Sequence, residues 1–188
     1  MPSRTSGVYR LMEAPVLYLA VAARPTGIMG VKMAPGPEKL VRQLDPQWSR
    51  VEVGVNPVLD RAVSQLEEYF EGKRRVFDLP LDLAALTPFR RSVLEVLSET
   101  VPYGATCTYA ELARWCGSPR AARGVGRALA LNPLPVLIPC HRVVGAHNRL
   151  VGYSGGRGIA TKQWLLDLER RCLVRSGGCG CALHRPDA

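Results

Sequence analysis

The hydrophobic and polar positions of the first half predict a β-hairpin. Residues 16–23 and 28–33 are two runs of apolar, β-prone residues. The stretch between them, Arg24-Pro-Thr-Gly27, is a turn signal, so the two runs are predicted to pair. Two shorter candidates follow, a helix at Pro37–Leu44 and a strand at Val51–Val55.

A longer amphipathic helix is predicted next. Asn56 can cap it, and Pro57 suits its first position because that position needs no backbone N–H donor. Apolar residues recur at helical spacing from Val58 to Phe70, and Gly72 ends the pattern. The basic, then Leu- and Pro-rich segment 73–86 reads as a connector, and we place a domain boundary at its end.

The second half is predicted to be mainly helical. One helix starts at Thr87-Pro88 and stops before Pro102. Thr108 and Glu111 form a capping-box pattern that opens another helix, which ends near Cys116-Gly117. Ser118-Pro119 is then predicted to cap and open a third helix, which gives a helix-turn-helix outline.

The third of these helices, "SPRAARGVGRALALNP", is rich in small residues and arginine. Gly124 and Gly126 lie in its interior, where each glycine costs about 1 kcal/mol relative to alanine. Arg120, Arg123 and Arg127 are spaced by three and four, so they are expected to share a face. A close helix–helix contact and a close approach to a DNA backbone both explain the glycines, and the arginines favour DNA.

Composition and charge fit an intracellular protein with a polyanionic partner. Hydrophobic residues make up 47% of the 188 residues and charged residues 22%, which suits a globular domain. The formal net charge is +9, which favours nucleic acid, although a basic surface that binds nothing stays open. Neither a signal peptide nor an apolar segment of the roughly 18–20 residues that span a bilayer is evident. We expect the cytoplasm of a bacterium or the nucleus of a eukaryote.

The segment "PVLIPCHRVV" carries the candidate chemistry. A buried structural thiol is the ordinary role of a cysteine and is expected for Cys107 and Cys116. Cys140 differs because His141 and Arg142 follow it, and a nearby cation favours the nucleophilic thiolate. Consecutive side chains diverge, so His141 is expected to reach the Cys140 thiol through a bridging water.

The combination of "NPLPVLIPCHRVV", "GYSGG", a following lysine and "WLLDLE" resembles the O6-alkylguanine-DNA alkyltransferases. This family is also called the methylated-DNA–protein-cysteine methyltransferases. The resemblance is strongest from Thr87 to Glu169. It implies an α/β (α+β) fold, with an N-terminal RNase H-like domain of antiparallel sheet and helix before a helical domain with a helix-turn-helix. The domains are then expected at 1–86 and 87–171, with a Cys- and Gly-rich tail at 172–188.

The resemblance also implies a role for each matching residue. Cys140 would accept the alkyl group, His141 would take the thiol proton, and Glu169 would orient His141. Tyr109 would hydrogen-bond the leaving guanine, and Asn132 would fix the turn before Cys140. The substrate would be bound by Tyr153, Ser154, Val144 and Gly155. Arg123 would occupy the space that the flipped nucleotide leaves in the base stack. The other DNA contacts would be made by Arg120, Arg127, Ala122 and Thr108.

The resemblance implies that the protein needs no cofactor and that its partner is double-stranded DNA containing O6-alkylguanine. It also implies that the protein is a monomer and does not bind a membrane. A thioether is a poor leaving group, so one turnover per molecule is expected. Cys172, Cys179, Cys181 and His184 form a thiol-rich cluster that could bind zinc. We expect no metal there, because the Cys-x-Cys spacing is tighter than usual and three glycines loosen the segment.

Three rival functions stay open at this point. A lesion sensor without transfer activity would lack a use for Cys140. A thiol hydrolase could use the same Cys, His and Glu, but no separate oxyanion motif is evident and the helix-turn-helix outline would go unexplained. A transcriptional regulator would need a second DNA-binding module, which is not evident.

Overall fold

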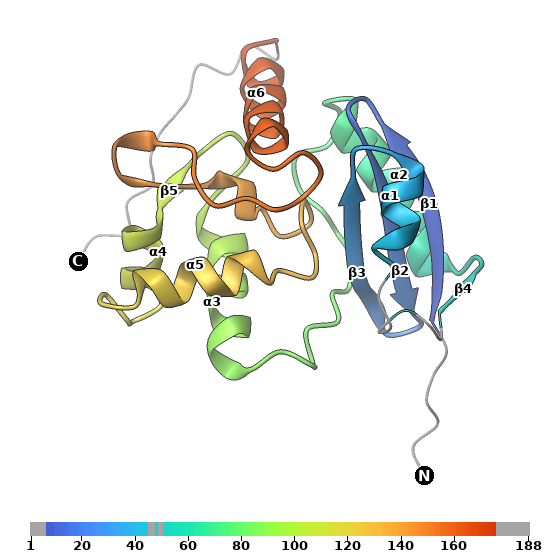
Figure 1. The fold of residues 1–188 in the computed structure, drawn as a ribbon, viewed down its shortest axis with the longest axis horizontal. Helices are drawn as coiled ribbons and strands as arrows, with labels where there is room; N and C mark the ends of the chain where they lie inside the picture. The colour runs from blue at the N-terminus through green and yellow to red at the C-terminus, as the bar shows by residue number, and fades with distance from the viewer. Residues whose placement is uncertain (1–6, 45–47, 49–50, 176–188) are drawn as a thin grey trace.

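The computed structural model describes residues 7–44, 48 and 51–175, and it shows a mixed α/β fold, as predicted. The strands are β1 (Val8–Ala14), β2 (Leu17–Arg24), β3 (Gly27–Ala34), β4 (Glu52–Val53), β5 (Cys107–Thr108) and β6 (Val143–Val144). The helices are α1 (Pro37–Arg42), α2 (Pro57–Phe70), α3 (Pro88–Thr100), α4 (Tyr109–Trp115), α5 (Ala122–Ala130) and α6 (Ile159–Arg175), with 3-10 turns at Cys140–Arg142 and Ala146–Asn148. The N-terminal sheet and the helical C-terminal half stand side by side, with α6 near their junction (Figure 1).

The N-terminal sheet has the order β3-β2-β1-β4, in which β1, β2 and β3 are antiparallel and β4 is parallel to β1. The predicted hairpin is confirmed as β2 and β3, which meet across the pair Arg24 and Gly27. Strand β1 was missed, because Arg10 and Glu13 break up its apolar residues. The predicted strand at 51–55 is reduced to the two residues of β4.

The two faces of the sheet bury different side chains. Leu17, Leu19 and Val21 on β2 belong to the large core, which also takes in α2 and much of the C-terminal half. The intervening Ala20 and Ala22 face a smaller cluster with Leu40 and Trp48. This alternation is the period of two that a strand imposes on its side chains. One continuous core therefore joins the two halves.

Two of the three helix starts for which a side-chain cap is expected begin at the predicted residue. Asn56 accepts a hydrogen bond from the Leu59 amide at 2.7 Å and starts α2 as predicted. The Thr108 hydroxyl accepts from the Glu111 amide, and the Glu111 carboxylate accepts from the Thr108 amide at 2.7 Å, so the capping box of α4 is confirmed.

The predicted start of the next helix at Ser118-Pro119 is wrong. Helix α5 begins at Ala122, and the residue before it, Ala121, makes no side-chain cap. The Ser118 carbonyl instead accepts from the Ala121 amide at 2.8 Å and closes a separate turn. Arg120 therefore precedes the helix and does not share a helical face with Arg123 and Arg127.

The edge strand β3 is hydrogen-bonded to loops of the C-terminal half. The Val31 amide donates to the Pro133 carbonyl at 2.8 Å, and the Gly156 amide donates to the Met33 carbonyl at 3.2 Å. These bonds satisfy backbone groups that would otherwise be unpaired at a sheet edge. They also fix the sheet against the two loops that flank Cys140 in space.

Candidate active site

Cys140 opens a 3-10 turn at the end of a loop that Asn132 holds in shape. The Asn132 side-chain amide donates to the Ile138 carbonyl at 3.0 Å, and its oxygen accepts from the Leu134 amide at 3.0 Å. Val136 within this loop has φ of 74°, a left-handed conformation that is unfavourable for a β-branched residue. The Asn132 bonds therefore stabilise a strained loop that positions Cys140.

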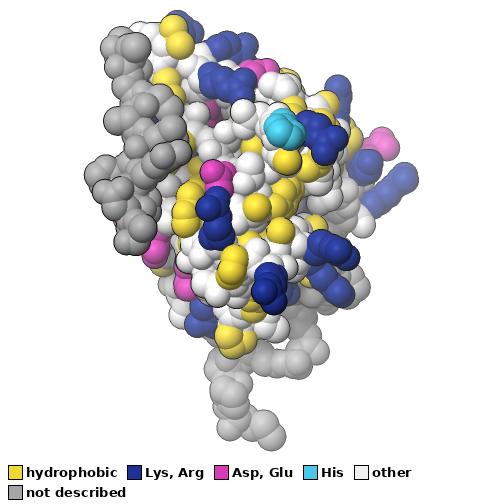
Figure 2. All heavy atoms as spheres, turned by 90° about the vertical axis from the view of Figure 1, so that its left-hand side faces the viewer, with side chains coloured by type: hydrophobic (Ala, Val, Ile, Leu, Met, Phe, Trp, Pro, Cys, Tyr) yellow, Lys and Arg dark blue, Asp and Glu magenta, His cyan; other side chains and the backbone are white. Residues whose placement is uncertain are grey.

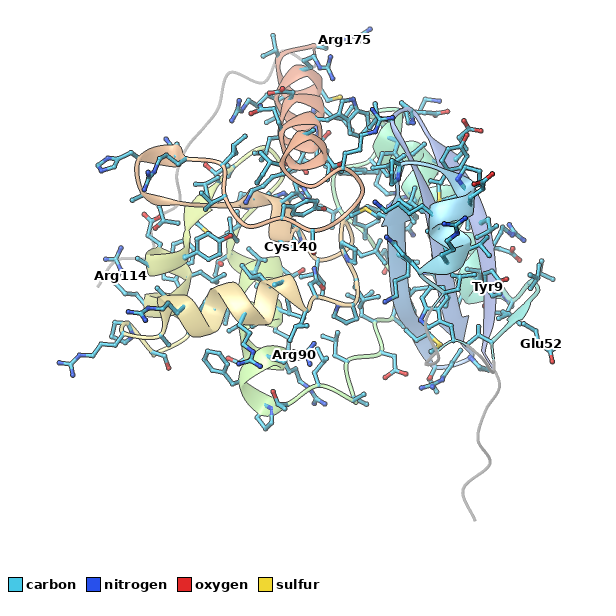
Figure 3. All side chains as sticks on the ribbon, viewed as in Figure 1. Tyr9, Glu52, Arg90, Arg114, Cys140 and Arg175 are labelled. Atoms are coloured by element: carbon cyan, nitrogen blue, oxygen red, sulfur yellow. The ribbon has the colours of Figure 1, made fainter. Side chains whose placement is uncertain are left out.

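The Cys140 side chain borders a pocket of about 400 Å³ between the two halves of the molecule. Figure 3 shows Cys140 between the helices and the sheet. The C-terminal half contributes Asn132, Tyr153, Ser154 and Gly155 to the lining, and the N-terminal half contributes Val31, Lys32 and Met33. The pocket thus brings Cys140 together with four other predicted residues, which lie between positions 132 and 155 of the sequence.

His141 and Glu169 are hydrogen-bonded to each other, as expected if Glu169 orients His141. We call the predicted series of Cys140, His141 and Glu169 the relay. His141 Nε2 lies 2.9 Å from Glu169 Oε1, and both side chains are fully buried. The other ring nitrogen, Nδ1, is buried without a hydrogen-bond partner among the described residues. That nitrogen is therefore available to accept a proton.

The Glu169 carboxylate is held by donors from three more residues. Arg142 donates from Nε at 3.1 Å and from Nη2 at 3.0 Å. The Tyr69 hydroxyl donates at 2.8 Å, and the Gly104 amide donates at 2.8 Å. A buried carboxylate with so many donors is fixed in place and stays charged.

Burial shifts the pKa values of Cys140 and His141 so that both groups are neutral before reaction. Burial raises the pKa of Cys140, against smaller opposing effects of an Asn132 hydrogen bond and the Lys162 charge. Burial lowers the pKa of His141, which Glu169 partly opposes. At neutral pH the pair is therefore a neutral thiol beside a neutral imidazole. This is the starting state of a thiol that needs a base.

Lys162 is a buried cation that the sequence analysis left without a role. Its side chain is 0% exposed, and Nζ donates to the carbonyls of Val143 at 2.6 Å and Val151 at 2.7 Å. These bonds tie α6 to the strand after Cys140 and to the loop before Tyr153. Burial lowers the pKa of Lys162, and the Cys140 thiolate would raise it.

Other predicted residues lie near the pocket without bordering it. Val144 is buried in β6, where it pairs with Thr108 in β5. The Tyr109 hydroxyl donates to the Val151 carbonyl at 3.3 Å, and the Tyr109 ring lies 6.0 Å from Lys162 Nζ. Their assigned contacts with substrate and DNA stay predictions.

Helix α5 presents arginines and small residues at the surface. Arg120, Arg123 and Arg127 are exposed. A Cβ added at Gly124 would lie 3.5 Å from the Phe89 ring, and one added at Gly126 would lie 3.7 Å from the Tyr109 ring. Both are ordinary contacts, so packing within the chain does not require glycine at either position. The face of the molecule that holds α4 and α5 carries more basic than acidic side chains (Figure 2).

The residues described by the structure contain no cluster of three or more His, Cys, Asp or Glu side chains that could hold a metal ion. Of the four tail residues considered for zinc, Cys172 lies in α6, whereas Cys179, Cys181 and His184 lie outside the described residues. Within the described ranges, no helix is long and apolar enough to cross a membrane.

Acid is expected to destabilise the fold through Glu169 and His141. Burial alone would raise the pKa of Glu169, but His141 and Arg142 outweigh burial and lower it to about 2 from 4.5. A carboxylate with a lowered pKa stabilises the fold above its unfolded value and loses that effect as pH falls from 4.5 toward 2. His141, with a lowered pKa, loses its contribution as pH falls below 6.5.

Urea unfolding between pH 7.5 and 3 measures this effect. We expect the free energy of unfolding to fall with pH, with roughly 2 kcal/mol of the loss between pH 7.5 and 3 due to Glu169. The Glu169→Gln variant should show a shallower decline below pH 4.5. An equal decline in both proteins would assign the acid sensitivity to other groups.

Comparison with known proteins identifies the family. Residues 8–83 match the ribonuclease-like domain of 6-O-methylguanine DNA methyltransferase, and residues 88–171 match its DNA binding domain. A methylated-DNA–protein-cysteine methyltransferase of Mycolicibacterium paratuberculosis is 40% identical over 87% of this chain and 92% of its own length. One from Methanosarcina acetivorans is 37% identical over 87% of this chain and 99% of its own.

Solved structures agree with the sequence comparison. The O6-methylguanine methyltransferase of Mycobacterium tuberculosis superposes with a TM-score of 0.74 and 36% identity, covering 88% of this chain and 93% of that chain. The same enzyme in complex with DNA also gives a TM-score of 0.74 at 36% identity, over 87% and 93% of the two chains. The chain therefore belongs to the 6-O-methylguanine DNA methyltransferase family and is a DNA-repair protein that transfers alkyl groups to a cysteine.

Proposed function

We propose that the protein takes the alkyl group from O6 of a guanine in duplex DNA and keeps it on Cys140. The observation that carries this assignment is that Cys140, which borders a pocket of about 400 Å³, directly precedes His141, whose ring is hydrogen-bonded to Glu169. No cofactor is needed, because the thiol supplies the nucleophile. The protein would act once and as a monomer, in the cytoplasm of a bacterium or the nucleus of a eukaryote.

The reaction balances with these residues alone. His141 Nδ1 takes the Cys140 proton through a bridging water, and Glu169 stabilises the imidazolium that forms. The sulfur attacks the alkyl carbon, so a C–S bond forms while the bond from that carbon to O6 breaks. The guanine leaves with the electron pair of the broken bond and takes up one proton. We assign Tyr109 as the hydrogen-bond donor to the departing base.

The product explains single use. A thioether sulfur carries no acidic proton and is a poor leaving group, so neither His141 nor water regenerates the thiol. Each molecule of protein would therefore repair one lesion. Transfer should be stoichiometric even at a large excess of DNA.

The target base must leave the duplex to reach a buried thiol, because the reactive carbon is otherwise inside the stack. Helix α5 is the proposed reader of the minor groove. Its glycines are not required by internal packing, which leaves close approach to the DNA backbone as their explanation. We propose that Arg123 fills the space of the flipped base, that Arg120 and Arg127 contact phosphates, and that Ala122 and Thr108 lie against the groove.

Around the flipped base, Tyr153 would form a wall of the pocket, with Ser154 and Gly155 beside it. Val144 would support the pocket from β6. We also propose that the chain divides after residue 86 and that residues 87–171 carry DNA binding and transfer. Of the tail expected at 172–188, residues 172–175 belong to α6. Removing residues 176–188 should leave transfer unchanged.

The Arg123→Ala variant tests base flipping. Flipping costs a few kcal/mol, so we expect transfer from an O6-methylguanine duplex to fall by roughly 10- to 100-fold. The reaction with free O6-methylguanine base should change by less than about twofold, because no duplex has to open. The measurement is the single-turnover rate with each substrate.

Arg170→Ala is the matched control, because Arg170 is an exposed arginine on α6 whose side chain is 3.5 Å from Asp167. This variant should leave both rates unchanged. Equal losses on duplex and free base in Arg123→Ala would remove the flipping role from Arg123.

A lesion sensor is the second candidate, because it would use the same pocket and helix. It does not account for a cysteine that directly precedes a histidine whose buried Nδ1 has no hydrogen-bond partner among the described residues. Mass analysis of the protein after reaction separates the two functions, since a sensor stays unmodified.

A further inference from the structure

A tyrosine hydroxyl from the N-terminal half lies beside both His141 and Glu169. Tyr69 lies near the end of α2, is 0% exposed, and donates to Glu169 Oε1 at 2.8 Å. The same hydroxyl oxygen is 3.5 Å from His141 Nε2. We infer that Tyr69 is a positioning residue for alkyl transfer, which acts through Glu169 to set the orientation and basicity of His141.

Packing alone does not explain a tyrosine at this position. The ring contacts Phe70 and Phe77 at centroid distances of 5.4 Å and Tyr103 at 5.9 Å, all of which a phenylalanine would provide equally well. A buried hydroxyl loses its hydration and must be compensated by a partner. The partner in this structure is the Glu169 carboxylate, so the hydroxyl has a specific use there.

The hydroxyl shares one carboxylate oxygen with the imidazole. Glu169 Oε1 accepts from Tyr69, His141 and Arg142, and each donor withdraws part of the negative charge that the others experience. Without the Tyr69 hydroxyl, Oε1 would attract the His141 proton more strongly. The protonated imidazole would then persist to higher pH, and it cannot accept the thiol proton.

The charged and titratable groups around His141 come from several elements. Glu169 and Lys162 face it from α6, Arg142 is its neighbour in the 3-10 turn, and Tyr69 faces it from α2. Tyr103 and Cys172 interact with each other, and Tyr103 is also close enough to Glu169 and Arg142 for their charges to affect its pKa. Tyr69 is the member of this set that the N-terminal half supplies, so the sheet domain would take part in the chemistry.

The inference rests on the proposed transfer to Cys140, and its test is the pH dependence of Tyr69→Phe. The substrate is an O6-methylguanine duplex at saturating protein, and the measurement is the single-turnover rate between pH 5 and 9. We expect a loss of about 10- to 100-fold at neutral pH, the order of magnitude for losing a hydrogen bond to a charged group. The acid limb of the profile should move to higher pH by about 0.5, while affinity for the duplex stays unchanged.

Tyr18→Phe is the matched control. Its hydroxyl also donates to a carboxylate, that of Glu13 at 3.0 Å, but this pair is exposed. Its rate and pH profile should equal those of the wild type. If the wild type itself shows no transfer, the proposed function fails, whereas an active wild type with an unchanged profile in folded Tyr69→Phe overturns only the inference.

Two further measurements keep the test decisive. In a Glu169→Gln background, adding Tyr69→Phe should cost nothing more, because the path through the carboxylate is already lost. An additional loss there would mean that Tyr69 acts elsewhere. If Tyr69→Phe does not fold, 3-fluorotyrosine placed at position 69 provides a stronger donor, and the acid limb should move to lower pH. No movement would overturn the inference.

Discussion

The Cys140→Ala variant is expected to lose alkyl transfer completely while it keeps its affinity for duplex DNA within about twofold. Transfer requires a sulfur at the pocket border, and alanine has none. DNA binding should survive, because charge attraction from the basic surface does not involve the thiol. The measurements are methyl transfer from an O6-methylguanine duplex and a binding titration with the same duplex at fixed salt.

Cys116→Ala is the control for this experiment. Cys116 is a half-buried thiol at the end of α4, away from the residues that line the pocket. Its replacement should leave transfer at the wild-type rate. Residual dealkylation by Cys140→Ala would show that another thiol is the acceptor and would refute the assignment of Cys140.

The Glu169→Gln variant should show the second-largest effect. Replacing the orienting carboxylate of a triad by its amide lowers the rate by about 10⁴-fold in well-studied cases, so we expect a loss of roughly 10³- to 10⁴-fold. The amide keeps the shape of the side chain but leaves Arg142 buried without its counter-charge. Removing one partner of a buried pair costs about 3–5 kcal/mol of stability. Rates should therefore be compared at a temperature where the variant is fully folded.

Asp167→Asn separates the catalytic effect from the loss of a charge on α6. Asp167 lies two residues before Glu169, and its carboxylate pairs with Arg170 at the surface at 3.5 Å. An exposed pair of this kind contributes about 0–1 kcal/mol, so this variant should match the wild type in rate and stability. A Glu169→Gln variant that transfers as fast as Asp167→Asn would exclude the proposed relay.

Local signals predicted much of the fold. The turn residues before Gly27 identified the β2–β3 hairpin, and the pairs Asn56–Pro57 and Thr108–Glu111 located two helix starts, because capping depends on neighbours in the chain. Strand β1 was missed since its pairing with β2 and β4 compensates for two charged residues in its sequence. The start of α5 was placed too early because Ser118 uses its backbone in a turn instead of capping.

The site was predictable where a contiguous motif carried it. Cys140 and His141 are adjacent, and the family resemblance supplied Glu169, which the structure brings to 2.9 Å from His141. Tyr69 was read only as an apolar position of a helix, because its partner lies 100 residues away. Lys162 was similarly seen only as part of a motif, since nothing in the sequence shows that a lysine will be fully buried. Long-range polar pairs of this kind leave no periodic signal.

The most direct measurement is the mass of the protein after reaction with an O6-methylguanine duplex, followed by trypsin digestion. Trypsin should release residues 128–142 as one peptide, and Cys140 is its sole cysteine. The account predicts a single gain of about 14 Da, one methyl group in place of the thiol proton, and places it on that peptide. An unmodified protein that still binds the duplex, or a methyl group on any other peptide, would contradict it.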